Sequence, residues 1–157
     1  MPLLRAYHPS DRAAVLGLLA SLSARYPGAT EWLQRRLTDV EEGQARCTVV
    51  EVDGTLGAVM IETPKPPHQI KMSTLYVSED CRHMGLAQLL IRHAQPLWAK
   101  EGITRVYSSV DSSHPSLPFY TKLGWVVTDV APGRYAADRD ELVVELRGSL
   151  GPSATSD

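Results

Sequence analysis

The stretch "SEDCRHMGLAQLL", residues 78–90, combines residue types that could do chemistry. It could be a plain connection, a phosphate cradle at a helix start, or a metal or redox site on Cys81 and His83. Gly85 would let a ligand approach the main chain, and Arg82 could reach a phosphate oxygen. A metal site is less favoured, because no second Cys/His pair complements the first. Walker loops and dinucleotide fingerprints need further glycines, so neither fits.

The elements on either side of this stretch would have to position it. "QIKMSTLYV" alternates as a strand that ends at Val77, and a helical period begins at Gly85. The apolar face expected for this helix comprises Leu86, Leu89, Leu90, His93 and Leu97. Pro96 should kink the helix unless it ends early. A strand, a turn and a helix in this order point several amides at one spot, where an anion can bind.

Before this stretch, the sequence predicts one strand, two helices and a hairpin. "LLRAY" is strand-like, and residues 13–22 have the period of an amphipathic helix, although their length also suits a signal-peptide core. Thr30 is the expected N-cap of a second helix. Its expected apolar positions are Trp32, Leu33, Leu37 and Val40. "RCTVVEV" and "TLGAVMIET" flank Asp53-Gly54, which predicts an antiparallel hairpin, and "PKPPH" should be loop.

After the stretch, the sequence predicts a strand, a short helix and two final strands. "TRVYSSV" is the strand, and residues 114–123 form the helix, with Gly124 as its C-cap. "WVVTDV" and "ELVVELR" follow, separated by a polar loop from Ala131 to Arg139. The order β, α, α, β, β, β, α, β, α, β, β predicts an α/β (α+β) fold in which helices pack on a mixed sheet.

Composition limits the function classes. The chain has 157 residues and a net charge of -2, so no bulk basic field favours nucleic acid or an anionic membrane. We expect one domain over residues 1–147 and a flexible tail over 148–157. Cys47 and Cys81 lack CxxC spacing, which indicates reduced thiols and a cytoplasmic location. No apolar run reaches the roughly 18 residues of a membrane span.

A second motif, "LPFYTKLGWVV" at residues 117–127, decides between the interpretations of residues 78–90. Together the two stretches resemble the GNAT superfamily of acyl-CoA-dependent N-acetyltransferases, whose patterns are "Q/R-x-x-G-x-G/A" and "FY-x-K-L-G-F/W". The matching residues are Arg82, Gly85 and Ala87, then Phe119, Tyr120, Lys122, Leu123, Gly124 and Trp125. The element order fits the family from Leu3 to Arg147. The resemblance implies a seven-stranded, mostly antiparallel sheet with about four helices, splayed between strands four and five.

The resemblance also implies how acetyl-CoA, the cosubstrate, binds. The amides of the turn would hold its pyrophosphate, and the pantetheine arm would pair with the end of the fourth strand as an added strand does. The cofactor-binding residues implied are Leu75, Tyr76, Val77, Arg82, His83, Met84, Gly85, Leu86, Ala87, Tyr120 and Lys122.

Amine attack on a thioester needs an unprotonated amine, a donor for the oxyanion and a proton source for the thiolate. By resemblance Tyr120 is the proton source, and an amide near Val77 serves the oxyanion. Lys71 stands where histone-type members carry a glutamate, and a charged lysine cannot replace it as a base. The candidate bases are Glu62, His68, Asp111 and His114. The pattern at each of them favours an exposed polar residue or a cap over a base, and water chains can replace a fixed base. Ser113 stands where the family often has asparagine.

Two functions therefore compete. The chain is either an N-acetyltransferase acting on a primary amine of a small molecule, peptide or protein, or a catalytically silent acyl-CoA-binding or sensing module. A nucleotide-binding regulator would leave "FYTKLGW" unexplained. The expected partners are acetyl-CoA and an amine, with no metal, nucleic acid or membrane. A homodimer is plausible, because many relatives of this family pair through their last strands.

Overall fold

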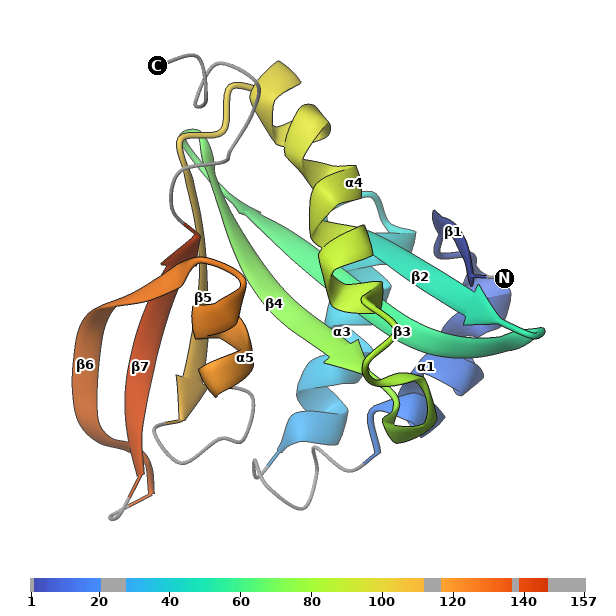
Figure 1. Cartoon of the computed structure of the whole chain (residues 1–157), viewed down its shortest axis with the longest axis horizontal. Coiled ribbons are helices and arrows are strands. Elements are labelled where there is room, and N and C mark those ends of the chain that lie inside the picture. The colour runs from blue at the N-terminus through green and yellow to red at the C-terminus, as the bar shows by residue number, and fades with distance from the viewer. Residues whose placement is uncertain (1, 21–27, 112–116, 137–138, 147–157) are drawn as a thin grey trace. The chain divides into compact units, whose positions relative to one another are not determined.

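The computed structural model describes residues 2–20, 28–111, 117–136 and 139–146 (Figure 1). The elements in chain order are β1 (Pro2–Ala6), η1 (Pro9–Asp11), α1 (Arg12–Leu18), α3 (Ala29–Glu41), β2 (Arg46–Val52), β3 (Thr55–Lys65), β4 (Gln69–Val77), η2 (Glu79–Cys81), α4 (Leu86–Lys100), β5 (Arg105–Asp111), α5 (Leu117–Lys122), β6 (Trp125–Ala136) and β7 (Arg139–Leu146). The strands form one seven-stranded sheet in the order β1-β2-β3-β4-β5-β7-β6. β4 and β5 are parallel, whereas β1–β2, β2–β3, β5–β7 and β6–β7 are antiparallel, so the expected mixed sheet is confirmed.

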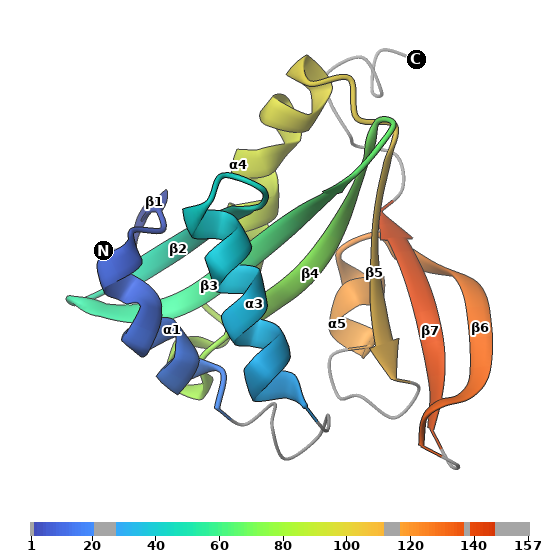
Figure 2. The same cartoon turned by 180° about the vertical axis from the view of Figure 1, so that it is seen from behind.

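The chain divides into two compact units. The first comprises Met1–Pro64 with Ser73–Ile91, and the second comprises Lys65–Met72 with Arg92–Asp157. In the first unit α1 and α3 cover one face of β2 and β3, and the start of α4 lies on the other face (Figures 1 and 2). The core beneath α1 and α3 consists of Val15, Leu19, Leu33, Leu37, Cys47, Val49, Val59 and Ile61. The amphipathic-helix interpretation of this segment is therefore confirmed for Arg12–Leu18.

The β2–β3 hairpin forms as its sequence predicts. Val52 pairs with Thr55 across the turn. Asp53 and Gly54 adopt φ values of 53° and 81°, in the left-handed region that a tight hairpin turn with the twist of its strands requires. The register slips between Val50 and Glu51: Val50 pairs with Ala58 and Glu51 with Leu56, so the ladder passes over Gly57.

An ion pair fixes the start of the chain. Arg5 on β1 donates from both terminal nitrogens to the Asp11 carboxylate, at 2.8 and 2.9 Å, and the His8 amide adds a third bond to it. The hydrogen bonds from Arg5 hold the pKa of Asp11 below its usual range. This carboxylate therefore stabilises the fold above its unfolded-state pKa, and the contribution is lost as the pH falls through the lowered folded-state value.

We expect Asp11→Asn to lower the free energy of unfolding at neutral pH by about 1–2 kcal/mol, because bonds between charged groups are lost. The variant should also lose less stability than the wild type when the pH falls below the usual aspartate pKa. Urea unfolding between neutral and acid pH measures both effects. Glu42→Gln removes an exposed carboxylate and is the control. Equal acid dependence of the wild type and Asp11→Asn would contradict the prediction.

In the second unit β5, β7 and β6 form an antiparallel sheet, and α5 contacts β6. Buried side chains of this unit come from the start of β4, from alternating positions of β5 and β7, from the later turns of α4, and from α5 and the start of β6. They are Ile70, Met72, Val106, Ser108, Val110, Leu142, Val144, Leu146, Ala94, Trp98, Tyr120 and Trp125. β4 joins β5 through three pairs, Gln69–Lys71 with Arg105–Tyr107. The ladder therefore pairs only the first three residues of β4 with β5.

Four local expectations need correction. Gly28, with φ 78°, is the N-cap of α3, and Thr30 lies inside the helix. β3 continues through Pro64 to Lys65, and β6 continues to Ala136, so part of each expected loop is strand. For β6 the reason is its place at the edge of the sheet, where a strand that pairs on one side only accommodates such residues.

The fourth correction concerns the buried face of α4, which runs through Pro96 to Lys100. Leu86 and Leu90 are buried as expected, but Leu89 and His93 are exposed. The rest of the buried face comprises Ala87, Ile91, Ala94 and Trp98. The helix is rotated because burying Ile91 and Trp98 removes more apolar surface from water than burying His93 would.

Candidate active site

The turn after β4 reverses the chain within a few residues. The Cys81 amide donates to the Ser78 carbonyl at 3.0 Å and closes η2, and Arg82 then returns to an extended conformation. His83 and Gly85 follow with φ values of 70° and 75°. Two left-handed residues so close together bend the main chain sharply and direct it into α4.

The amides of this turn are available to a ligand. Leu89 donates to the Gly85 carbonyl at 3.0 Å, the first main-chain bond of α4. The amides of residues 83–88 donate to no main-chain acceptor in the described part of the chain. These donors surround the positive end of the dipole of a 15-residue helix, which is an arrangement that suits a phosphate group.

The side chains of the turn leave its amides accessible. A Cβ at Gly85 would meet nothing within 4 Å, so the space in front of the glycine is open. Leu86 and Ala87 are buried and hold the first turn of α4 in the core, whereas His83 and Met84 are exposed. The structure thus places the predicted residues 82–87 on one turn.

Arg82 contacts the end of β4. Its Nε donates to the Val77 carbonyl at 3.3 Å, and its guanidinium carbon lies 5.9 Å from the centroid of the Tyr76 ring. Leu75, Tyr76 and Val77 are all half-buried, and the Ser78 amide donates to Gly57 of β3 at 2.9 Å. Arg82 therefore links the turn to the strand that we expected to bind the pantetheine arm.

Gly57 is a residue of this region that the sequence analysis missed. A Cβ on Gly57 would lie 2.9 Å from Sγ of Cys81, 3.2 Å from Cγ2 of Val52 and 3.4 Å from Cδ1 of Leu86. The glycine thus lets η2 and the first residue of α4 approach β3 closely. A glycine inside an apolar strand is the sequence signal that could have indicated this approach.

We expect Gly57→Ala to lower the free energy of unfolding by about 1–3 kcal/mol, because the added methyl overlaps with a short, packed side chain. Displacement of Cys81 and Leu86 should also weaken ligand binding at the turn. Gly57→Ala/Cys81→Ala should recover much of the loss, since it removes the atom in closest contact. Gly17→Ala, in open space on α1, is the control, and urea unfolding is the measurement. If Gly57→Ala is as stable as the wild type, the close packing of Cys81 against Gly57 is contradicted.

In the second unit, α5 buries Tyr120, which is only 5% exposed. Its ring meets that of Trp125 edge to face, with the centroids 5.3 Å apart and the planes at 69°. Leu123 and Gly124 donate to the carbonyls of Tyr120 and Thr121, and Gly124, with φ 92°, ends the helix as predicted. Lys122 is exposed in the last turn. The beginning of the expected helix, residues 114–116, lies outside the described residues.

The turn and α5 are the two places at which family patterns matched the sequence, and comparison with known proteins now assigns the family. A sequence model described as the Acetyltransferase (GNAT) family matches residues 15–125. The chain belongs to the GNAT family of acetyltransferases. No curated protein matches the sequence.

Solved structures agree with this assignment in fold. A protein from Desulfovibrio desulfuricans that is assigned to the GNAT family superposes with a TM-score of 0.83 at 16% identity, over 96% of this chain and 100% of its own. The PaiA N-acetyltransferase from Thermoplasma acidophilum, in complex with coenzyme A, gives 0.74 at 15% identity, over 93% and 98%. The ribosomal-protein-S18-alanine N-acetyltransferase from Escherichia coli gives 0.75 at 15% identity, over 93% of each chain.

The candidate bases of this GNAT chain have different surroundings. Glu62 is fully buried, and its two oxygens accept from Nη2 and Nε of Arg46 at 2.9 and 3.1 Å. His68 lies in an exposed turn, where its carbonyl accepts the Thr104 amide at 2.8 Å. Lys71 pairs with Tyr107 in the β4–β5 ladder.

The remaining candidates are less completely described. Asp111 ends β5 and pairs with Glu141 of β7, but the structure does not describe its side chain. Ser113 and His114 lie outside the described residues. No group of His, Cys, Asp and Glu that could hold a metal occurs among the described residues. Among these residues, no helix is long and apolar enough to span a membrane.

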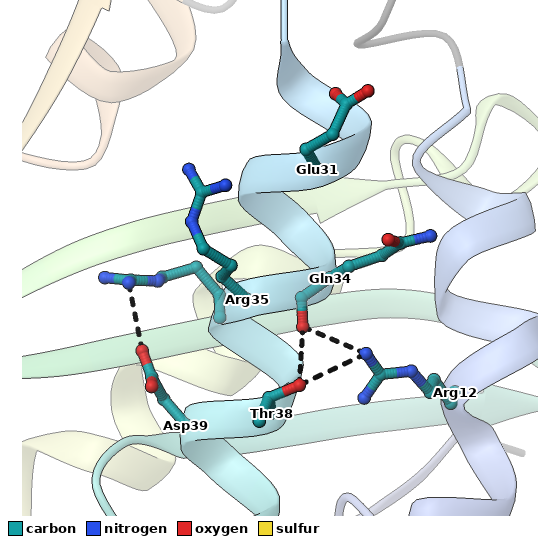
Figure 3. A pocket seen from close by; sticks show the side chains of 7 residues that line it. Arg12, Glu31, Gln34, Arg35, Thr38 and Asp39 are labelled. Carbon is teal, nitrogen blue, oxygen red and sulfur yellow. Dashed lines mark hydrogen bonds and ion pairs between the residues drawn. The ribbon is translucent and has the colours of Figure 1, made fainter.

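A shallow cavity of about 460 Å³ lies elsewhere, along α3. It is lined by Arg12, Glu31, Gln34, Arg35, Arg36, Thr38 and Asp39 (Figure 3). Arg12 points toward α3 and donates to the Gln34 carbonyl and the Thr38 hydroxyl. Arg36 forms an ion pair with Asp39. Since these arginines have partners within the cavity wall, the turn at Gly85 is the better candidate for binding an anion.

Proposed function

We propose that this GNAT protein transfers the acetyl group of acetyl-CoA to a primary amine of a small molecule, peptide or protein. The observation that carries the proposal is the row of amides at residues 83–88, which donate to no main-chain acceptor among the described residues and surround the open space at Gly85. Two solved relatives are complexes with coenzyme A: the PaiA enzyme and an aminoglycoside 6'-N-acetyltransferase. Their identity to this chain is low, so they support the cofactor class and leave the acceptor open.

The amides of the turn would hold the pyrophosphate, with the helix dipole of α4 adding to the attraction. Main-chain groups of Leu75–Val77 would pair with the pantetheine arm. Arg82 lies beside these groups, because its Nε already contacts the Val77 carbonyl. It can therefore exchange this weak, exposed bond for one to a phosphate oxygen.

Acetyl-CoA supplies the thioester. In the reaction the amine nitrogen bonds to the carbonyl carbon, the C–S bond breaks, and an amide near Val77 stabilises the oxyanion. The Tyr120 hydroxyl then gives its proton to the departing thiolate. The proton lost by the amine goes to a base, for which Glu62, His114 and a water chain are the candidates. The Arg46 ion pair occupies both oxygens of Glu62, which favours the other two.

Calorimetric titration with acetyl-CoA, CoA, ATP and NAD tests the binding, and thiol release in the presence of a panel of amines tests the turnover. We expect acetyl-CoA and CoA to bind and ATP and NAD to bind far more weakly. Amine-dependent thiol release confirms the transferase. CoA binding without turnover by any amine would instead favour a silent sensing module, to which Lys71 at the position of the family glutamate already points. Absence of CoA binding would refute the assignment of the turn.

A further inference from the structure

Ser108 is a buried polar side chain on β5 that the proposed chemistry does not use. The residue is 5% exposed. Its hydroxyl donates to the main-chain carbonyl of Met72 on β4, with 2.8 Å between the two oxygens. A buried hydroxyl and a buried carbonyl both need a partner, so this bond satisfies two groups at once.

This bond stands at the end of the β4–β5 ladder. The ladder joins residues 69–71 of β4 to residues 105–107 of β5, so Met72 and Ser108 occupy the next position along it. At this position the side-chain hydroxyl of β5 donates to the β4 carbonyl. On its other side Ser108 remains in register with Val144 of β7. β5 itself is therefore held in place where its pairing with β4 ends.

A serine hydroxyl extends beyond the main chain, so it can satisfy a carbonyl at a wider strand separation than an amide can. We propose that Ser108 is a positioning residue, which holds the Met72 carbonyl without continuing the ladder. It thereby fixes β4 immediately before residues 73–77, the part of this strand proposed to receive the arm of acetyl-CoA. The inference rests on the proposed function, because it assigns a role in binding the same cosubstrate.

The test compares Ser108→Ala and Ser108→Thr with the wild type. Ser108→Ala removes the donor, so β4 either leaves the Met72 carbonyl unpaired or shifts to pair further with β5. We expect the Kd and the KM for acetyl-CoA to rise about tenfold, with kcat within about twofold, because the loss affects binding and not a bond made only in the transition state. Ser108→Thr keeps the hydroxyl and should bind within about threefold of the wild type, as a retained hydrogen bond requires.

Ser109→Ala is the matched control, since Ser109 follows on the same strand, is only half-buried and faces the opposite side of the sheet. It should leave the Kd for acetyl-CoA unchanged. If Ser108→Ala does not fold, as judged by circular dichroism, Ser108→Cys replaces it, because a thiol is similar in size but a weak donor. The Kd of Ser108→Cys for acetyl-CoA should then be higher than the Kd of Ser108→Thr and of the wild type.

The outcomes separate this inference from the proposed function. If the wild type binds acetyl-CoA and Ser108→Ala, or Ser108→Cys in its place, binds equally well, the positioning role is wrong and the proposed function stands. If Ser108→Ala and Ser108→Thr both show a raised KM for acetyl-CoA, the positioning role is likewise wrong, because Ser108→Thr keeps the hydroxyl. If the wild type itself binds no CoA, both proposals fail together.

Discussion

Gly85→Glu should abolish the binding of acetyl-CoA, with a loss of affinity of at least about a hundredfold. The new carboxylate would stand in the space that is open in front of the glycine, next to the amides of residues 83–88. There it would compete with the pyrophosphate for the same donors and repel its negative charge. Isothermal calorimetry with CoA measures the loss directly, without depending on the identity of the amine.

Two controls separate charge from backbone strain in this experiment. Gly85 has φ 75°, so any side chain there costs about 1–2 kcal/mol of stability. Gly85→Ala carries the same strain without charge or bulk and should bind CoA better than Gly85→Glu. Gly102→Glu places the same residue at another exposed glycine of φ 73° with open space around it, and it should bind CoA as the wild type does. Wild-type affinity in Gly85→Glu would refute the phosphate site.

Tyr120→Phe is the second change with a large expected effect. It should lower kcat by roughly a hundredfold to a thousandfold, the range for loss of a general acid, while the Kd for CoA stays within about threefold. The substitution keeps the ring and its edge-to-face contact with Trp125, so the fold should be preserved. Steady-state kinetics with the best amine from the panel, together with CoA titration, separate these effects.

The control for this prediction is Tyr107→Phe. Tyr107 is a half-buried tyrosine on β5 whose ring lies 4.1 Å from the guanidinium carbon of Arg105. Losing its hydroxyl leaves the proposed acid in place, so kcat should change little. If Tyr120→Phe keeps the kcat of the wild type, another group or water protonates the thiolate, and the role inferred for Tyr120 is wrong.

Much of the fold was predictable because the signals that specify it are local. Alternation of apolar residues, a left-handed Asp-Gly turn and a helical period each depend on neighbours within a few positions. Accordingly β2 and β4 have the bounds expected from the sequence, and the β2–β3 hairpin turns at Asp53 and Gly54 as expected. The helix caps were less predictable: Gly28, and not Thr30, caps the start of α3, because only the structure shows the left-handed backbone there, which favours a glycine.

The sequence by itself determined the order of the elements, the strand, turn and helix around Gly85, and the family to which the chain belongs, because these depend on residue types at short, fixed spacings. Only the tertiary structure decided which face of α4 is buried, since several stripes of this helix are apolar and its partners select one. Only the tertiary structure also showed that Gly57 must lack a side chain beside Cys81 and that Ser108 binds the Met72 carbonyl. These contacts join residues distant in sequence, so no local pattern encodes them.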